Sequence, residues 1–438
     1  MDLRDKKTKI TFYQGMRTIG GTIIEVNYGK NSIYFDFGSE FKPEVEEKRI
    51  SSLKDLISYG LALDLKGIYD RKHTDEVPES YKNKAVFISH IHLDHTKMIN
   101  YIDESIPVYT SKDTAKLLEV LNSNDEFLYA NPKLSTTTRQ LNAVNYGDVI
   151  HIGEIEVEFV RVDHDGYGAC GFIINTPDLS IAYTGDIRLH GYRKEDSLNF
   201  INKAKKCDIL IIEGVSVSFI DKIEDFEPEV ELTEDNIVKE FDKILQANKN
   251  RQITFNYYEA NIERIIEIIK VSKKNNRTLV LNEFYSYILK EVLGEEVHFY
   301  GDNYKKYNLD ENLKIEIDIL LKDHENYIWQ LPKDQLYLLE DMIESGIYIH
   351  CDADPLGEFD INYKPFMEEF RKHKINVIEL KCSGHAFPKD LIYIIDQIKP
   401  DLLVPIHSQK PEMLYNKYGD RLLPEKNQTI YGRKNEKK

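Results

Sequence analysis

A predicted strand that runs into three histidines and an acid has the clearest chemistry in the sequence. Residues 87–95 read Phe-Ile-Ser-His-Ile-His-Leu-Asp-His, which places His90, His92, Asp94 and His95 within six residues. Imidazole nitrogens and carboxylate oxygens are ligands for zinc, manganese and iron. A single histidine here would more often belong to a solvated loop. Four such ligands, brought together by a sharp turn after the strand, predict binding of two adjacent metals.

Two further ligands are expected at the ends of other strands. His164 follows the strand-like run 155–162, and Asp186 follows the strand-like run 180–183. A carboxylate shared by two cations offsets their mutual repulsion and leaves room for a bridging hydroxide, the nucleophile of two-metal hydrolases. We assign Asp186 to this bridging position.

The elements that must position these ligands follow from periodicity. Short β-rich runs dominate the N-terminal third, and a helical pattern covers 112–121. After the buried-strand-like run 207–213, strands alternate with longer amphipathic helices such as 233–247 and 259–273, which indicates α/β alternation around a partly parallel sheet. A last β-α-β unit is predicted over 376–381, 388–398 and 401–406.

Composition removes several classes of protein. The 438 residues carry 58 Lys and Arg against 75 Asp and Glu, a net charge of −17, which argues against indiscriminate binding to DNA or anionic membranes but leaves room for a local basic groove. The charged start and the lack of a long apolar run predict a cytoplasmic protein without signal peptide or membrane span. No G-x-S-x-G motif supports a serine nucleophile. Four scattered cysteines predict buried thiols rather than a disulfide framework.

Together with the ligand motif, three further motifs resemble those of the metallo-β-lactamase superfamily. Within it, they resemble those of the β-CASP branch, which includes ribonuclease J and the polyadenylation-cleavage nucleases. They are Glu213 after its strand, Cys382-Ser383-Gly384-His385-Ala386, and Pro405-Ile406-His407-Ser408. Segments 254–264 and 277–280 are similar to the cap inserted in that branch. The resemblance implies an α/β protein, an αββα sandwich over 1–217 and 375–438, with an inserted α/β cap over 218–374 and an active site in the cleft between them.

The resemblance also implies a role for each motif residue. One metal would be held by His90, His92 and His164, the second by Asp94, His95 and His407, with Asp186 shared. Asp36 and Glu213 would orient ligand imidazoles. His385 would contact the scissile phosphate, and Asp94, Asp186 and His385 are the expected catalytic residues. Arg264 in the cap motif is assigned to substrate; Arg188 and His190 could reach substrate phosphate, or form a structural salt bridge and lie on the surface.

The implied function is cleavage of phosphodiester bonds in nucleic acid, foremost single-stranded RNA, with two divalent metals, zinc or alternatively manganese. His385 is suited to stabilise the developing charge or to protonate the leaving oxygen. One alternative is hydrolysis of a small phosphodiester, nucleotide or ester. The stretches 282–285 and 350–357 favour it, because they carry acidic residues where ribonuclease J-like proteins have Gly/Ser-rich phosphate-holding loops, and carboxylates repel a polyanion. Another is a non-catalytic nucleic-acid-binding protein, against which the complete ligand set argues. A homo-oligomer is compatible with the sequence.

Overall fold

The computed structural model describes residues 7–40, 42, 45, 52–223, 233–358 and 360–432. The chain divides into two compact units, one formed by Met1–Glu227 with Gly384–Lys438 and the other by Pro228–Ser383. The first unit is therefore discontinuous in sequence, and the second is an insertion that overlaps the predicted segment 218–374.

Two seven-stranded sheets form the first unit. The first has the order β20-β1-β2-β3-β4-β5-β6 and the second the order β19-β18-β11-β10-β9-β8-β7. In the first sheet these are Gln428–Tyr431, Lys9–Gln14, Ile23–Tyr28, Asn31–Phe35, Lys84–Ile88, Val108–Ser111 and Asn142–Val144. In the second they are Asp420–Arg421, Leu402–Ile406, Ile209–Glu213, Ser180–Tyr183, Cys170–Asn175, Ile155–Arg161 and Val149–Ile152. Both sheets are mixed, because each combines antiparallel hairpins with parallel pairs such as β3–β4 and β11–β18.

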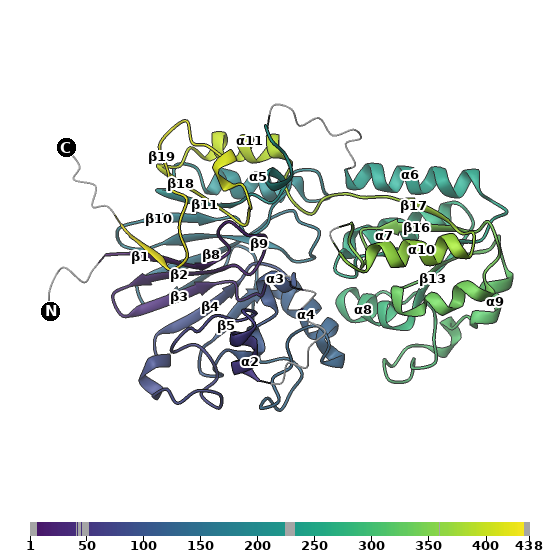
Figure 1. Ribbon diagram of the computed structural model, residues 1–438, viewed down its shortest axis with the longest axis horizontal. Coiled ribbons are helices and arrows are strands. Elements are labelled where there is room, and N and C mark those ends of the chain that lie inside the picture. The colour runs from purple at the N-terminus through teal and green to yellow at the C-terminus, as the bar shows by residue number, and fades with distance from the viewer. Residues whose placement is uncertain are drawn as a thin grey trace. The chain divides into compact units, whose positions relative to one another are not determined.

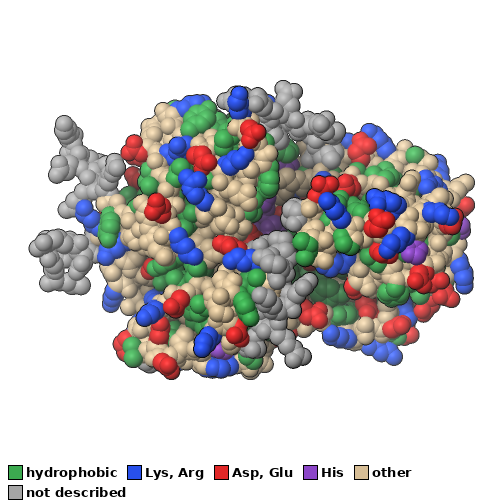
Figure 2. Space-filling view, in the orientation of Figure 1, with side chains coloured by type: hydrophobic (Ala, Val, Ile, Leu, Met, Phe, Trp, Pro, Cys, Tyr) green, Lys and Arg blue, Asp and Glu red, His purple; other side chains and the backbone are tan. Residues whose placement is uncertain are grey.

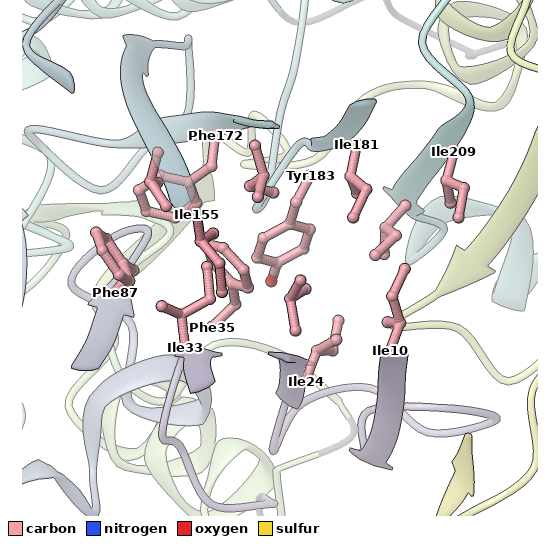
Figure 3. Close-up of a cluster of buried hydrophobic side chains, with 14 of the residues drawn as sticks. Ile10, Ile24, Ile33, Phe35, Phe87, Ile155, Phe172, Ile181, Tyr183 and Ile209 are labelled. Atoms are coloured by element: carbon pink, nitrogen blue, oxygen red, sulfur yellow. The ribbon is translucent and has the colours of Figure 1, made fainter. Parts of the chain in front are cut away.

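The core of this unit lies between the two sheets. Strand β8 alternates, with Ile155, Val157 and Phe159 buried and Glu156 exposed, as expected of a strand with one face in a core. Central strand β11 is buried on both faces and is correspondingly apolar throughout until Glu213. Figure 3 shows side chains of the two sheets pointing toward one another: Ile10, Ile24, Ile33, Phe35 and Phe87 from the first, and Ile155, Phe172, Ile181, Tyr183 and Ile209 from the second.

Helices cover the sheets of the first unit on their other sides. α5 and α11 lie side by side and pack their apolar faces on the second sheet (Figure 1), while α4 packs against β5 and β6 of the first. The helices are α2 Leu53–Ser58, α3 Leu93–Thr96, α4 Lys112–Leu121, α5 Lys194–Lys203 and α11 Pro388–Ile398, with short 3-10 turns η2 Pro78–Tyr81, η3 Ile99–Tyr101, η4 Asn122–Asn124, η5 Ser216–Phe219 and η8 Pro411–Met413. The predicted αββα sandwich with an inserted α/β unit is confirmed.

The second unit is built on a six-stranded sheet of order β14-β13-β15-β12-β16-β17. The strands are β12 Ile253–Tyr257, β13 Thr278–Asn282, β14 His298–Tyr300, β15 Tyr327–Gln330, β16 Ile347–Cys351 and β17 Asn376–Glu379; the helices are α6 Glu234–Ala247, α7 Ile262–Lys274, α8 Glu283–Leu293, α9 Ile317–Lys322 and α10 Tyr363–Lys372, with η6 Glu311–Leu313 and η7 Lys333–Asp341. Every pairing among its described strands is parallel, rather than only part of them as predicted. Helices in the crossovers explain this, because parallel neighbours need such connections.

No helix in the described part of either unit combines the length and apolarity needed to cross a membrane.

Candidate metal centre

The histidine-rich motif lies where β4 ends. Strand β4 ends at Ile88, the next residues form a turn, and α3 begins at Leu93 with His92 as its N-cap. The turn brings the side chains of the motif close together. Gly38 makes this turn possible: a Cβ there would overlap the backbone of Asp94, so only glycine permits the close approach. Asp36 after β3 and His407 after β18 have positive φ angles of 59° and 51°, an uncommon conformation for residues other than glycine.

The first ligand group consists of His90, His92, His164 and Asp186, each of which offers one atom within 4.8 Å of the others. Nε2 of His90 lies 3.4 Å from Oδ2 of Asp186. Nδ1 of His92 lies 3.1 Å from Nε2 of His164. Two nitrogens bound to one tetrahedral zinc at about 2.0–2.1 Å lie about 3.3–3.4 Å apart, so this pair is close to the required separation.

The second ligand group consists of Asp94, His95 and His407, again within 4.8 Å of one another. Oδ2 of Asp94 lies 3.3 Å from Nε2 of His407 and 3.5 Å from Nε2 of His95. The structure thus brings together all seven residues predicted as metal ligands, from the ends of β4, β8, β10 and β18.

Asp186 belongs to the first group and also lies beside the second. Its Oδ2 is 3.4 Å from Nε2 of His90 in the first group and 3.5 Å from Nε2 of His95 in the second. Burial by itself raises the pKa of this carboxyl, but His407 and His95 outweigh it and hold the pKa well below its usual range. Asp186 is therefore an anion placed between two sets of nitrogens.

Other groups hold the nitrogens of these imidazoles that face away from the centre. Nδ1 of His90 lies 2.9 Å from Oγ of Ser89, and Nδ1 of His95 lies 2.8 Å from Oδ2 of Asp36. Nδ1 of His164 bonds to the carbonyl of Gly384, and Nδ1 of His407 lies 3.3 Å from Oγ1 of Thr22. Such partners fix the tautomer and the orientation of a ligating histidine.

The donors that face the centre fit divalent cations. Nε2 of His90, His95 and His407 and both carboxylate oxygens of Asp186 are buried and make no hydrogen bond within the described residues. Leaving so many buried polar atoms unsatisfied is costly, and a cation coordinated by them removes that cost. Burial lowers the pKa of His164 to about 3, so its imidazole is neutral and retains the lone pair that a metal requires.

Asp36 accepts more hydrogen bonds than its sequence motif indicated. Besides the bond to His95, its carboxylate accepts from the backbone and hydroxyl of Ser89 and, at 2.6 Å, from the hydroxyl of Tyr183. Ser89, Tyr183 and Thr22 were not predicted from the sequence. Their only sequence signal is adjacency to strand ends that carry ligands, which is weak for hydroxyl residues.

His385 lies beside the ligands but belongs to neither group. Its Nδ1 is 3.7 Å from Oδ2 of Asp186 and 3.6 Å from Oε1 of Glu213. Burial lowers the pKa of His385, but the carboxylates of Asp186 and Glu213 outweigh burial and raise it to about 9. Glu213 also accepts from the backbone N–H of Val215 and of Ala386. It therefore holds the chain segment that carries His385, rather than a ligand imidazole as predicted.

Three predicted substrate contacts have other partners. Arg188 is 1% exposed and its Nε donates to Asp163 at 3.0 Å, which corresponds to the structural salt bridge. His190 is buried and stacks on Phe387 with ring centroids 4.0 Å apart, so it does not lie on the surface. Arg264 is fully buried in the second unit, and its guanidinium donates to Glu234 and Asp352. The prediction that Arg264 contacts substrate was wrong, because its donors are used inside the fold.

Substitution Glu234→Gln is expected to destabilise the second unit by about 3 kcal/mol. Glu234 is fully buried and accepts from both Nε and Nη2 of Arg264 at 2.9 Å. Removing one partner of a buried pair costs about 3–5 kcal/mol, and Asp352 still pairs with Arg264, which places the effect at the lower end. Trp329, the chain's single tryptophan, is buried in this unit, so urea unfolding followed by its fluorescence measures the loss.

The matched control for that measurement is Glu267→Gln. Glu267 pairs with Lys270 on the exposed side of α7, where such a pair contributes about 0–1 kcal/mol. An unfolding midpoint that moves equally in the two variants would contradict a structural role for the Glu234–Arg264 pair.

Comparison with known proteins gives one family. A Beta-lactamase superfamily domain matches residues 69–224. The chain is 22% identical to Ribonuclease J of Pyrococcus abyssi, over 92% of this chain and 90% of the relative, and 24% identical to Probable RNase MJ4 of Methanocaldococcus jannaschii, over 91% and 86%. A crystal structure of a protein of unknown function from Enterococcus faecalis V583 is 43% identical, covers 97% of this chain and 100% of its own, and superposes with a TM-score of 0.89. The chain therefore contains a Beta-lactamase superfamily domain, and over most of its length it is similar to ribonuclease J proteins.

Proposed function

We propose that this protein is a metal-dependent nuclease that hydrolyses phosphodiester bonds of single-stranded RNA. The observation that carries the proposal is the pair of ligand groups on either side of Asp186. The relatives named ribonucleases align with almost the whole length of the chain, and their names support RNA as the substrate.

Each residue of the centre has a proposed role. His90, His92 and His164 would hold one divalent ion, Asp94, His95 and His407 would hold the second, and Asp186 would be shared. The ions, zinc or manganese, would offset phosphodiester charge and bring the pKa of a bound water toward neutrality. Asp36 orients His95, because it accepts from Nδ1 and leaves Nε2 directed at the centre.

His385 is proposed to act on the substrate itself. It lies 3.7 Å from the shared carboxylate yet belongs to neither ligand group, so an N–H can be directed at phosphate bound there. Its charge can stabilise the pentacovalent transition state, and its proton can pass to the leaving oxygen. Glu213 keeps the histidine in place by its contacts with His385 and Ala386.

The distribution of charge indicates where phosphate is neutralised. On the face shown in Figure 2, Lys and Arg side chains are interspersed with Asp and Glu. Together with the net charge of −17, this supports neutralisation of phosphate at the metal centre rather than on a broad basic surface.

The proposal is tested by a gel time course on 5′-phosphorylated single-stranded RNA. The protein is first stripped of metal, then reloaded with zinc or manganese, and the content of bound metal is measured in the same samples. We expect two bound ions per chain, cleavage after reloading and none in the stripped protein. A salt series of RNA binding accompanies the time course, because a polyanionic substrate loses affinity steeply with salt.

Two outcomes would contradict the proposal. A protein that binds both ions but leaves RNA intact would point to a small phosphodiester or ester as substrate, and such a substrate should bind with little dependence on salt. A protein that binds no metal at neutral pH would overturn the metal centre itself.

A further inference from the structure

A carboxylate outside the two ligand groups lies against the first of them. Asp165 follows the ligand His164, and its Oδ1 is 3.3 Å from Nε2 of His92 and 3.4 Å from Nε2 of His164. This oxygen is buried and makes no hydrogen bond within the described residues, although the side chain as a whole is 15% exposed. Asp165 therefore has a charged atom beside two histidines of the first ligand group, and the proposed ligand set does not use it.

The other ligand histidines show what this atom does. Ser89, Asp36, Gly384 and Thr22 each lie against the nitrogen of a ligand imidazole that faces away from the centre. His92 differs, because it directs Nδ1 toward His164 and thereby turns Nε2 toward Asp165. Asp165 thus faces the outer nitrogen of His92 at 3.3 Å, on the side where Asp36 binds His95 at 2.8 Å.

We propose that Asp165 is a positioning residue of the metal centre, whose carboxylate faces Nε2 of His92 and holds Nδ1 of His92 toward the ion shared with His164. The inference rests on the proposed function, since it assumes that the first ligand group binds an ion. The carboxylate makes the His92 imidazole a stronger donor and adds a negative charge next to the cation, and both effects raise the affinity for metal.

The backbone of Gly384 keeps Asp165 in this place. A Cβ added to Gly384 would overlap the carboxylate of Asp165, so the two groups are in direct contact. The carbonyl of the same glycine accepts from Nδ1 of His164. One residue of the returning chain thus supports two neighbouring histidines, His164 directly and His92 through Asp165.

Metal affinity of the full-length variant Asp165→Asn tests the inference. Zinc affinity is measured by competition with a chelator, and the cobalt-substituted protein is examined by its visible d–d bands. We expect one of two ions to bind about 10–100-fold more weakly, the loss typical of removing such a partner, with the intensity of the d–d bands retained. The control Asp196→Asn removes the same charge from a 38% exposed side chain of α5 and should leave both readouts unchanged.

A second variant, Gly384→Ala, keeps every polar atom, and its Cβ would overlap the Asp165 carboxylate. It should lower the affinity for the same ion, and it tests the role of Asp165 by a second route if Asp165→Asn fails to fold. Wild-type affinity in both variants would overturn the role of Asp165. A large change in d–d intensity would overturn it too, because Asp165 would then be a direct ligand. If the wild-type protein itself bound no metal, the proposed function would fail rather than this assignment alone.

Discussion

Substitution Asp186→Asn should lower kcat/KM for RNA cleavage by more than about 10³-fold and reduce the number of tightly bound ions. Loss of a residue that merely supports a ligand costs about 10–100-fold, and Asp186 contacts both ligand groups. Asparagine keeps the shape of the side chain but removes the negative charge between the two sets of nitrogens. Cleavage rates and metal content measured on the same preparations check this expectation.

The control for this variant is Asp208→Asn. Asp208 precedes β11 in the same sheet, and its carboxylate accepts from the backbone and hydroxyl of Ser180 rather than from any ligand. This variant should retain both metals and an activity within a few-fold of wild type. Full metal content and unchanged cleavage in Asp186→Asn would remove Asp186 from the shared position and, with it, the two-metal interpretation.

The sequence predicted those features of the fold that local patterns determine. The boundaries of α4 and α11 follow from apolar periodicity and clear start signals, Ser111 as N-cap of the first and Pro388 in the first turn of the second. The convergence of His90 to His95 was predictable for the same reason, because a strand that stops and a helix that starts within a few residues must turn sharply.

Features that depend on distant residues were not predictable from these patterns. Strand β15 lies between β13 and β12, and β20 pairs with β1 from the other end of the chain, but hydrophobic periodicity contains no information on strand order. Arg264 shows the same limit for a side chain. Its partners Glu234 and Asp352 are 30 and 88 residues away, and only the folded chain shows that they bind its guanidinium.

Asp165 illustrates a different limit. The carboxylate stands next to a predicted ligand in the sequence, but its role depends on which nitrogen of His92 faces the centre. That choice of tautomer and ring orientation follows from the packing of His92 against His164, not from the spacing of the motif. The types of residue at a metal centre are thus readable from sequence, while the partners that orient them are not.

Substitution His385→Ala should lower kcat for RNA by about 10²–10³-fold while the protein keeps both ions, because general acid catalysis contributes about 10²–10⁴-fold and His385 lies outside both ligand groups. Retained metal separates this effect from that of Asp186→Asn. His385→Gln should recover little, since an amide can donate a hydrogen bond but cannot deliver a proton to the leaving oxygen.

A substrate with a better leaving group distinguishes the two roles of His385. Bis(4-nitrophenyl) phosphate releases a phenolate that needs no proton, so His385→Ala should cost much less on this substrate than on RNA if the imidazole acts as the acid. An equally large loss on both substrates would instead indicate that His385 stabilises charge on the phosphate, a role open to it because its Nδ1 lies 3.7 Å from the shared carboxylate. Loss of metal in His385→Ala would contradict both roles and make the histidine part of the ligand set.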